Sequence, residues 1–79
     1  MYTVYVLQDK NGELYKGLTN NLPRRLNEHK NGKTKTTSRM HNIKLSYKEE
    51  YKDFEEARRR ELYFKSAAGR RFLKKILRA

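Results

Sequence analysis

Residues 2–17 read YTVYVLQDKNGELYKG, a pattern that predicts a β-hairpin. The β-branched and aromatic residues at positions 2–7 are typical of a strand. Residues 9–12 supply turn chemistry and end in Asn-Gly, one of the strongest short signals for a hairpin. Residues 13–17 are predicted to be the returning strand, which we expect to end at Gly17. The first two elements are therefore two antiparallel strands.

A helix and a loop are predicted after the hairpin. Asn20 or Asn21 can cap a helix that begins near residues 22–23, because proline is tolerated in the first helical turn. The helix should stop at residues 31–32, since Asn-Gly is a favourable C-terminal pair. Residues 33–42 are polar and basic, and we expect them to form an exposed loop.

A third strand is predicted over residues 43–51. Apolar side chains at even spacing favour one buried face. They are Ile43, Leu45, Tyr47 and Tyr51. Glu49 interrupts this face, and we place it near the end of the strand.

Two further helices are predicted towards the C-terminus. Residues 53–56 resemble a capping box and begin a helix that runs to about Ala68. Gly69 is expected to break this helix. Residues 70–78 then form an amphipathic basic helix whose apolar side should dock on the sheet. That side holds Phe72, Leu73, Ile76 and Leu77.

The predicted order of elements is β-β-α-β-α-α. We expect an α/β (α+β) fold in which a three-stranded antiparallel sheet is flanked by helices. No internal repeat, linker or low-complexity tract divides the sequence, so residues 1–79 are expected to form a single domain.

The charge of the chain points to a polyanionic partner. Twenty Lys and Arg residues against nine Asp and Glu give a formal net charge of +11 and a pI near 10.1. Such a field favours nucleic acid, although a basic protein without such a partner and a protein that binds anionic membranes are alternatives. Charge gives affinity and not chemistry, so it does not separate an enzyme from a binding module.

The sequence has no cysteine and no membrane signal. Without cysteine, disulfides and thiolate metal sites are excluded. The N-terminal residues lack the regions of a signal peptide, and no apolar run approaches the length of a membrane span. We therefore expect a soluble, cytoplasmic protein.

Glu61 is an anomaly in the predicted second helix. At 100° per residue it lies in the middle of an inward stripe. The other members of that stripe are Phe54, Ala57, Phe64 and Ala68. A buried carboxylate is costly unless a cation, a metal or several donors accompany it. An ion pair with Lys65, at the favourable i, i+4 spacing, or with a neighbouring arginine explains Glu61 equally well.

Two pairs of residues could act on a phosphate. Arg25 and His29 lie one turn apart on the first helix, and the planar fork of arginine suits phosphate. The alternative is a solvated helix face, to which we assign Arg24. Tyr5 and Tyr15 lie on the two strands of the hairpin as near cross-strand neighbours, and aromatic packing is the alternative for them.

Taken in order, these segments resemble the GIY-YIG nuclease family. Thr3-Val4-Tyr5 and, ten positions after Tyr5, Tyr15-Lys16-Gly17 resemble the two halves of its signature. Residues 18–29 look like the family's first helix with its arginine and histidine, and residues 57–65 are similar to its metal-binding glutamate helix. The resemblance spans nearly the whole chain. It is closest to small stand-alone bacterial members, which implies the GIY-YIG fold in a bacterial cytoplasm, with association with the nucleoid as an option.

The sequence departs from the family pattern at several positions. Thr3 and Lys16 replace the Gly and Ile of the two triplets. Residues 41–43 lack the proline that many small relatives carry before the third strand. No counterpart is found for the asparagine that follows the glutamate helix in the related domain of the bacterial excision-repair incision subunit. No core catalytic position is lost, but these departures weaken the transfer of any one relative's substrate.

The resemblance implies an endonuclease that uses a metal to hydrolyse a phosphodiester. Glu61 would hold one Mg²⁺ or Mn²⁺, mostly through water. Tyr5 is the implied general base, with Tyr15 orienting the attacking water or sharing that role. Because free tyrosine has a pKa near ~10, positive charge from Arg25, the metal and His29 is expected to lower the pKa of Tyr5.

The resemblance also implies how the substrate is held. Arg25 would clamp the phosphate, and Gly17 would let the substrate approach the strand closely. Further contacts to nucleic acid are expected from basic and hydroxyl side chains. They are Lys33, Lys35, Thr37, Arg39, Lys65, Arg70 and Arg71.

The expected substrate is nucleic acid, with DNA favoured over RNA, in the repair or processing of single-stranded or branched structures. No small-molecule cofactor and no membrane partner are expected, and a protein partner is possible but not indicated. The rival interpretation is a non-catalytic basic accessory protein that binds nucleic acid on the same fold and needs no metal.

Overall fold

The elements follow one another in the predicted order in a computed structural model that describes residues 1–31 and 42–77. They are β1 (Tyr2–Gln8), β2 (Leu14–Thr19), α1 (Leu22–Lys30), β3 (Lys44–Tyr51), α2 (Phe54–Lys65) and α3 (Ala67–Leu77). The predicted β-β-α-β-α-α chain with a three-stranded antiparallel sheet is therefore confirmed.

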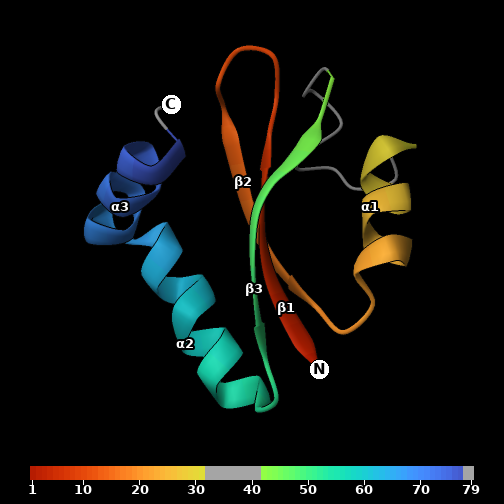
Figure 1. Cartoon of the computed structure of the whole chain (residues 1–79), viewed down its shortest axis with the longest axis vertical. Helices are drawn as coiled ribbons and strands as arrows, with labels where there is room; N and C mark the ends of the chain where they lie inside the picture. The colour runs from red at the N-terminus through yellow and green to blue at the C-terminus, as the bar shows by residue number, and fades with distance from the viewer. Residues whose placement is uncertain (32–41, 78–79) are drawn as a thin grey trace.

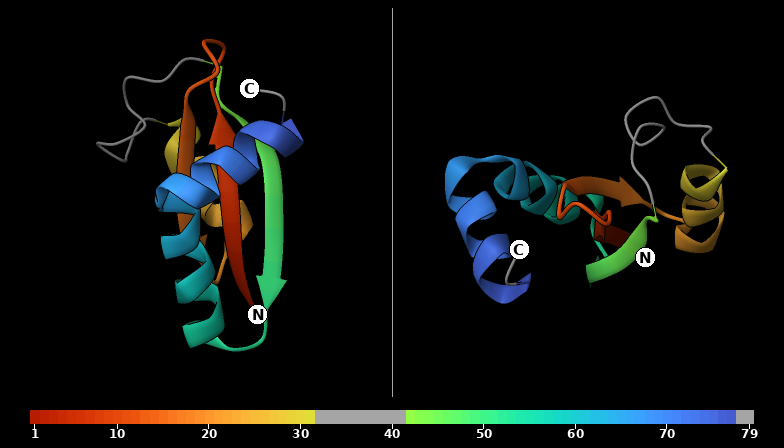
Figure 2. Two further views of the ribbon diagram at one scale, coloured as in Figure 1. Left: turned by 90° about the vertical axis from the view of Figure 1, so that its left-hand side faces the viewer. Right: turned by 90° about the horizontal axis from the view of Figure 1, so that it is seen from above.

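The first strand lies in the middle of the sheet. The strand order is β2-β1-β3, and both pairings are antiparallel. The strands are labelled in Figure 1, and the left view of Figure 2 shows them side by side in this order. Residues 4–7 of β1 are all 0% exposed, so this strand is buried on both faces. Seen from above, the sheet lies between α1 on one side and α2 with α3 on the other (Figure 2).

The two faces of β1 carry different kinds of residue. Val4 and Val6 point to one face and form a core with side chains of α2 and α3. That core is completed by Ala57, Phe64 and Leu73. Tyr5 and Leu7 point to the opposite face, which α1 covers. Tyr5 therefore lies on the face that has the smaller helical cover.

The hairpin turn is held by the carboxylate of Asp9. Its Oδ1 accepts hydrogen bonds of 2.9 Å from the backbone N–H groups of Asn11 and Glu13, and Gly12 takes the positive φ (84°) that the turn requires. The returning strand runs to Thr19, because its last residues still pair with β1. The expected end at Gly17 is therefore wrong by two residues.

A β-bulge divides the two faces of β3. The pairing shifts between Val6, which lies opposite Tyr47, and Leu7, which lies opposite Leu45. A bulge places an extra residue on one strand and turns the next side chain to the other face. Leu45 therefore faces the α1 side and is 38% exposed, while Tyr47 packs against the α2 core. The expectation of one apolar face along residues 43–51 is wrong for this reason.

Glu49 lies within β3, two residues before its end, and attaches the strand to α2. Its carboxylate accepts hydrogen bonds from the hydroxyls of Tyr47 (2.5 Å) and Tyr51 (2.6 Å) and from Arg60 Nε (2.8 Å). Burial raises the pKa of Glu49, but these donors outweigh it and hold that pKa below its usual range. The charge in the apolar face is thus fully partnered.

The break between the last two helices falls at Ser66 and not at Gly69. Asp53 caps the start of α2 as predicted, and Ser66 ends the helix by donating its hydroxyl to the carbonyl of Tyr63 (2.5 Å). Gly69 lies inside α3, where an added Cβ would meet the Tyr63 carbonyl oxygen at 1.8 Å. Glycine is needed because the two helices approach closely there, so its presence does not mark a helix end.

Three members of the expected buried stripes are partly or fully exposed. Phe54 is 49% exposed at the first residue of α2, and Ala68 is exposed because α2 has already ended. In α3, Leu73 is buried and Phe72 stacks on Phe64, but Ile76 is 41% exposed. The apolar side of α3 packs largely on α2, whereas the sequence predicted that it would dock on the sheet. Fewer of its apolar side chains are therefore buried than predicted.

We predict that Gly69→Ala strongly destabilises the fold. The added methyl group would overlap backbone atoms of Tyr63 and Phe64, which cannot rotate away, so a loss of about 3 kcal/mol in the free energy of unfolding is expected. Urea denaturation followed by circular dichroism measures it. Ala68→Gly, at the exposed neighbour, is the control and should cost about 1 kcal/mol or less. Equal losses in the two variants would contradict the close approach of the helices.

Candidate active site

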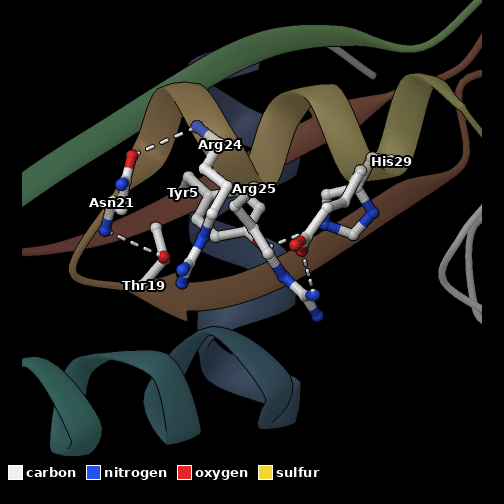
Figure 3. A network of polar contacts seen from close by, with 7 residues as sticks. Tyr5, Thr19, Asn21, Arg24, Arg25 and His29 are labelled. Carbon is white, nitrogen blue, oxygen red and sulfur yellow. Dashed lines mark hydrogen bonds and ion pairs between the residues drawn. The ribbon is translucent and has the colours of Figure 1, made fainter.

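Asn21 joins the end of β2 to the start of α1. Its side-chain Oδ1 accepts from the backbone N–H of Arg24 (3.2 Å), and its own N–H donates to Thr19 Oγ1 (3.0 Å) (Figure 3). Of the two predicted caps, Asn21 is therefore the one used. This cap fixes the register of α1, so that His29, one turn after Arg25, is buried in the last turn.

Tyr5, Tyr15 and His29 form an aromatic cluster between the sheet and α1. Tyr5 Oη lies 2.9 Å from His29 Nε2, and the ring centroids of Tyr15 and His29 lie 4.9 Å apart. The centroids of Tyr5 and Tyr15 lie 6.2 Å apart, because Tyr5 is opposite Gly17 and Tyr15 is opposite Leu7. The predicted proximity of the two tyrosines is confirmed.

Gly17 makes room for the ring of Tyr5. A Cβ at position 17 would lie 2.5 Å from both Tyr5 Cζ and Tyr5 Oη. The structure therefore shows a close approach by Tyr5, whereas the sequence prediction assigned the space at Gly17 to the substrate. The glycine and the tyrosine lie directly opposite each other in the sheet, so any side chain at position 17 would force the ring of Tyr5 to move.

Burial keeps the Tyr5–His29 pair uncharged. It raises the pKa of Tyr5 to about 12, and the neighbouring Arg25 lowers that pKa by less. Arg25 therefore lowers the pKa of Tyr5 in the expected direction, but by less than burial raises it. Burial, followed by the charge of Arg25, also lowers the pKa of His29 below its ordinary value of 6.5. At neutral pH the two rings share one hydrogen bond between a phenol and a neutral imidazole.

Arg25 connects this cluster to the protein surface. Its Nη1 lies 2.9 Å from Glu28 Oε1, and its side chain is 34% exposed. Hydrogen bonding to Glu28 and then to Tyr5 raises the pKa of Arg25, so the guanidinium is permanently charged. In Figure 3 the side chains of Arg24 and Arg25 extend from α1 across β2.

A cleft of about 510 Å³ lies where α1, α2 and the end of β2 meet. Polar and charged residues from all three elements line it, among them Thr19, Asn20, Arg24, Arg25, Arg58 and Glu61. The fold therefore brings two of the predicted catalytic residues, on separate helices, to one opening. Arg24 was assigned to a solvated face; it is exposed and also lines the cleft.

Glu61 is buried at the α2 side of the cleft and is ion-paired. Its Oε1 lies 2.6 Å from Arg58 Nη1, and its Oε2 lies 3.3 Å from Lys65 Nζ. The predicted i, i+4 pair with Lys65 is confirmed, and Arg58 is a second partner. Glu61 is 7% exposed, whereas the side chains of both cations are 50% exposed. The cations can therefore swing into solvent, but the carboxylate cannot.

The donor set at this cleft suits a hydrated divalent cation. In the part of the chain that the structure describes, no group of three or more His, Cys, Asp or Glu side chains could enclose a metal. Glu61 offers carboxylate oxygens at the edge of an open cleft, and Mg²⁺ is commonly held by one or two carboxylates, water and substrate phosphate. The residues fit such an ion and do not fit a structural zinc site.

Only some of the remaining predicted contact residues lie beside a cleft or groove. Lys33, Lys35, Thr37 and Arg39 lie outside the described residues. Lys65 contacts Glu61, and Arg70 lines a groove beside the hairpin. Arg71 is exposed and lines neither that groove nor the cleft.

Sequence reasoning missed Arg58 and Lys16 as functional candidates. Arg58 could have been found from its i, i+3 spacing to Glu61. Lys16 and Lys74 lie on different elements, and no local pattern in the sequence pairs them.

Comparison with known proteins identifies the family. The family model described as the GIY-YIG catalytic domain matches residues 1–75. The chain belongs to this family. The resemblance of its triplets and glutamate helix is thereby confirmed, and the GIY-YIG family is a family of nucleases.

Several relatives of this GIY-YIG chain are UPF0213 proteins. One from Bacillus licheniformis is 44% identical over 62 residues, which cover 77% of this chain and 64% of that protein. One from Streptococcus agalactiae is 43% identical over 63 residues, which cover 78% of this chain and 72% of that protein. The solution NMR structure of the UPF0213 protein BH0048 from Bacillus halodurans has a TM-score of 0.59 at 31% identity, and covers 96% of this chain and 85% of that chain.

Residues 1–31 and 42–77 contain no helix with the length and apolar character that a membrane crossing requires.

We predict that the stability of this GIY-YIG domain falls as the pH drops below 6.5. Because the pKa of His29 is lowered in the folded chain, the unfolded chain binds the proton more tightly. The contribution of neutral His29 is complete above pH 6.5 and is lost as the pH falls through the lowered pKa. Melting temperatures measured at pH 8 to 5 test this. His29→Gln should flatten the wild-type slope in that window, and an identical slope in both proteins would contradict it.

Proposed function

We propose that this chain is a divalent-metal-dependent endonuclease that hydrolyses phosphodiester bonds in nucleic acid, with DNA as the first substrate to test. The proposal rests on one arrangement: Arg25 of α1 and Glu61 of α2 line the same cleft. Membership of a nuclease family and a net charge of +11 support it. Relatives from bacteria and the absence of cysteine support a cytoplasmic setting.

The scissile phosphate would enter between the arginines. Arg24 and Arg25 line the α1 side of the cleft and Arg58 lines the α2 side. A guanidinium makes two parallel hydrogen bonds to phosphate oxygens, and it keeps its charge at every physiological pH. Arg25 would leave Glu28 for the phosphate and stabilise the charge that builds up during attack.

Glu61 would hold the Mg²⁺ or Mn²⁺. When bound, such an ion stabilises the negative charge on the phosphate and on the leaving oxygen. Arg58 and Lys65 must first release the carboxylate, and the entering phosphate offers these cations a replacement anion. This exchange makes the affinity of free Glu61 for metal weak, so metal and substrate would bind together.

The Tyr5–His29 pair would accept the proton of the attacking water. With a pKa of about 12, Tyr5 is not a phenolate at neutral pH, so we assign it the role of a relay. Its oxygen takes the proton of the water while its own proton passes to Nε2 of neutral His29, 2.9 Å away. Movement of Arg25 onto the phosphate would uncover Tyr5 Oη. Tyr15, which is half-buried, would orient the water.

We predict that the wild-type protein cleaves at least one labelled substrate in Mg²⁺ or Mn²⁺ and none in chelator. Single-stranded, duplex and branched DNA and RNA are compared. Glu61→Gln should lower the rate by at least about 100-fold, and Tyr5→Phe by a similar factor. Glu56→Gln removes an exposed charge from the same helix and should leave the rate unchanged.

The same experiment decides between the enzyme and its rival. The ion pairs of Glu61 with Arg58 and Lys65 are also what a non-catalytic binding protein would show. Loss of folding in Glu61→Gln would assign the carboxylate a structural role. Binding of every substrate without cleavage would favour the accessory protein over the nuclease.

A further inference from the structure

A second opening lies beside the cleft, between the hairpin and α3. It is a groove of about 200 Å³ lined by Gly12, Leu14, Lys16, Arg70 and Lys74. Three of its five lining residues carry a positive charge, and the other two are a glycine and a leucine. None of these residues takes part in the site described above.

The groove and the cleft lie along one face of β2. Leu14, Lys16 and Leu18 alternate with the residues that face α1, so they point to the same side of the sheet. Leu18 lines the cleft, whereas Leu14 and Lys16 line the groove. At about 3.3 Å per residue, Leu14 and Leu18 are about 13 Å apart along the strand.

The helices opposite β2 carry a matching row of cations. Arg58, Glu61 and Lys65 occupy one face of α2 at i, i+3 and i+7, and the two cations bind the carboxylate between them. Beyond the break at Ser66, the row continues with Arg70 and Lys74, one turn apart on α3. Glu61 is the acidic member of this row, and together with Arg58 it lies at the end of the row that lines the cleft.

The cations of the groove have no acidic partner among the residues that the structure describes. In that part of the chain, no carboxylate forms an ion pair with Lys16, Arg70 or Lys74. Burial, together with the charges of Arg70 and Lys65, lowers the pKa of Lys16. Like charges gathered in a concave surface attract an anion.

We propose that the groove of Lys16, Arg70 and Lys74 binds backbone phosphates of the substrate, so that one strand runs from the cleft past Glu61 and along β2. The span of about 13 Å corresponds to about four base-pair steps along the axis of B-form DNA, at about 3.4 Å of axial rise per step. The position of the cut relative to the groove rests on the proposed function, but the binding of phosphates in the groove does not.

The groove predicts different effects for two pairs of neighbouring residues on α3. Arg70 and Lys74 line the groove, whereas Arg71 and Lys75 lie about 100° away around the helix. All four are exposed, so alanine should not disturb the fold. Arg70→Ala with Lys74→Ala and Arg71→Ala with Lys75→Ala remove the same charge. The comparison therefore separates direct phosphate binding from net charge, and it also tests the sequence prediction for Arg71.

The test is binding of fluorescent single-stranded and duplex DNA at several salt concentrations, with chelator present. For duplex DNA, a plot of log affinity against log salt concentration has a negative slope. The magnitude of that slope decreases by about 0.9 for each phosphate that the protein no longer neutralises. The magnitude of the slope should therefore decrease by about 1.8 in the Arg70/Lys74 variant and by less than half as much in the Arg71/Lys75 variant. Equal changes in slope, or a larger change in the Arg71/Lys75 variant, would overturn the proposal that the groove binds phosphates.

The experiments distinguish a failure of the phosphate-binding proposal from a failure of the nuclease proposal. Binding is measured without metal, so it does not depend on cleavage. Metal-dependent cleavage together with equal slopes in the two variants would refute phosphate binding in the groove and would support the nuclease proposal. A selective decrease in the Arg70/Lys74 variant, with no cleavage by wild type, would support the groove and remove the catalytic proposal.

Discussion

Four consecutive residues of β1, from Val4 to Leu7, are completely buried, and the structure depends on covering both faces of this strand. A domain of 79 residues has little apolar material, so each face receives only a small layer of helix. The helix α1 covers one face, and α2 with α3 covers the other (Figure 2). The two layers meet beyond the end of β2, which is where the cleft lies. The candidate site is therefore a consequence of burying the central strand.

Burial also decides the chemistry available to Tyr5. The ring fits between the sheet and α1 because position 17 has no side chain, and its hydroxyl reaches His29. The same enclosure raises its pKa to about 12, so the positive charge of Arg25 cannot produce a phenolate at neutral pH. The proposed transfer of a proton from Tyr5 to neutral His29 is compatible with this environment.

Local signals in the sequence predicted most of the fold and part of the site. Asp53 and the Asp9 turn act through neighbours in sequence, so capping and turn rules place them correctly, and the same rules narrow the cap of α1 to Asn20 or Asn21. The position of Glu61 in an apolar stripe indicated that it has partners. The break at Ser66 is made by local hydrogen bonds to Tyr63 and from Gly69, and it was missed because Gly69 was interpreted as the end of the helix. The bulge in β3 depends on how elements pack together, and no local pattern encodes it. For the same reason, the groove of Lys16, Arg70 and Lys74 could not be found before the hairpin and α3 were seen together.

In the proposed nuclease, Glu61 is the carboxylate that holds the metal at this cleft. Paramagnetic broadening of amide NMR signals by Mn²⁺ tests it directly, because broadening detects weak binding in the free protein and needs no substrate. The strongest broadening should fall on Glu61 and on Thr19 and Asn20 across the cleft, and it should disappear in Glu61→Gln. Broadening centred on another acidic residue, or unchanged in Glu61→Gln, would show that Glu61 does not hold the metal.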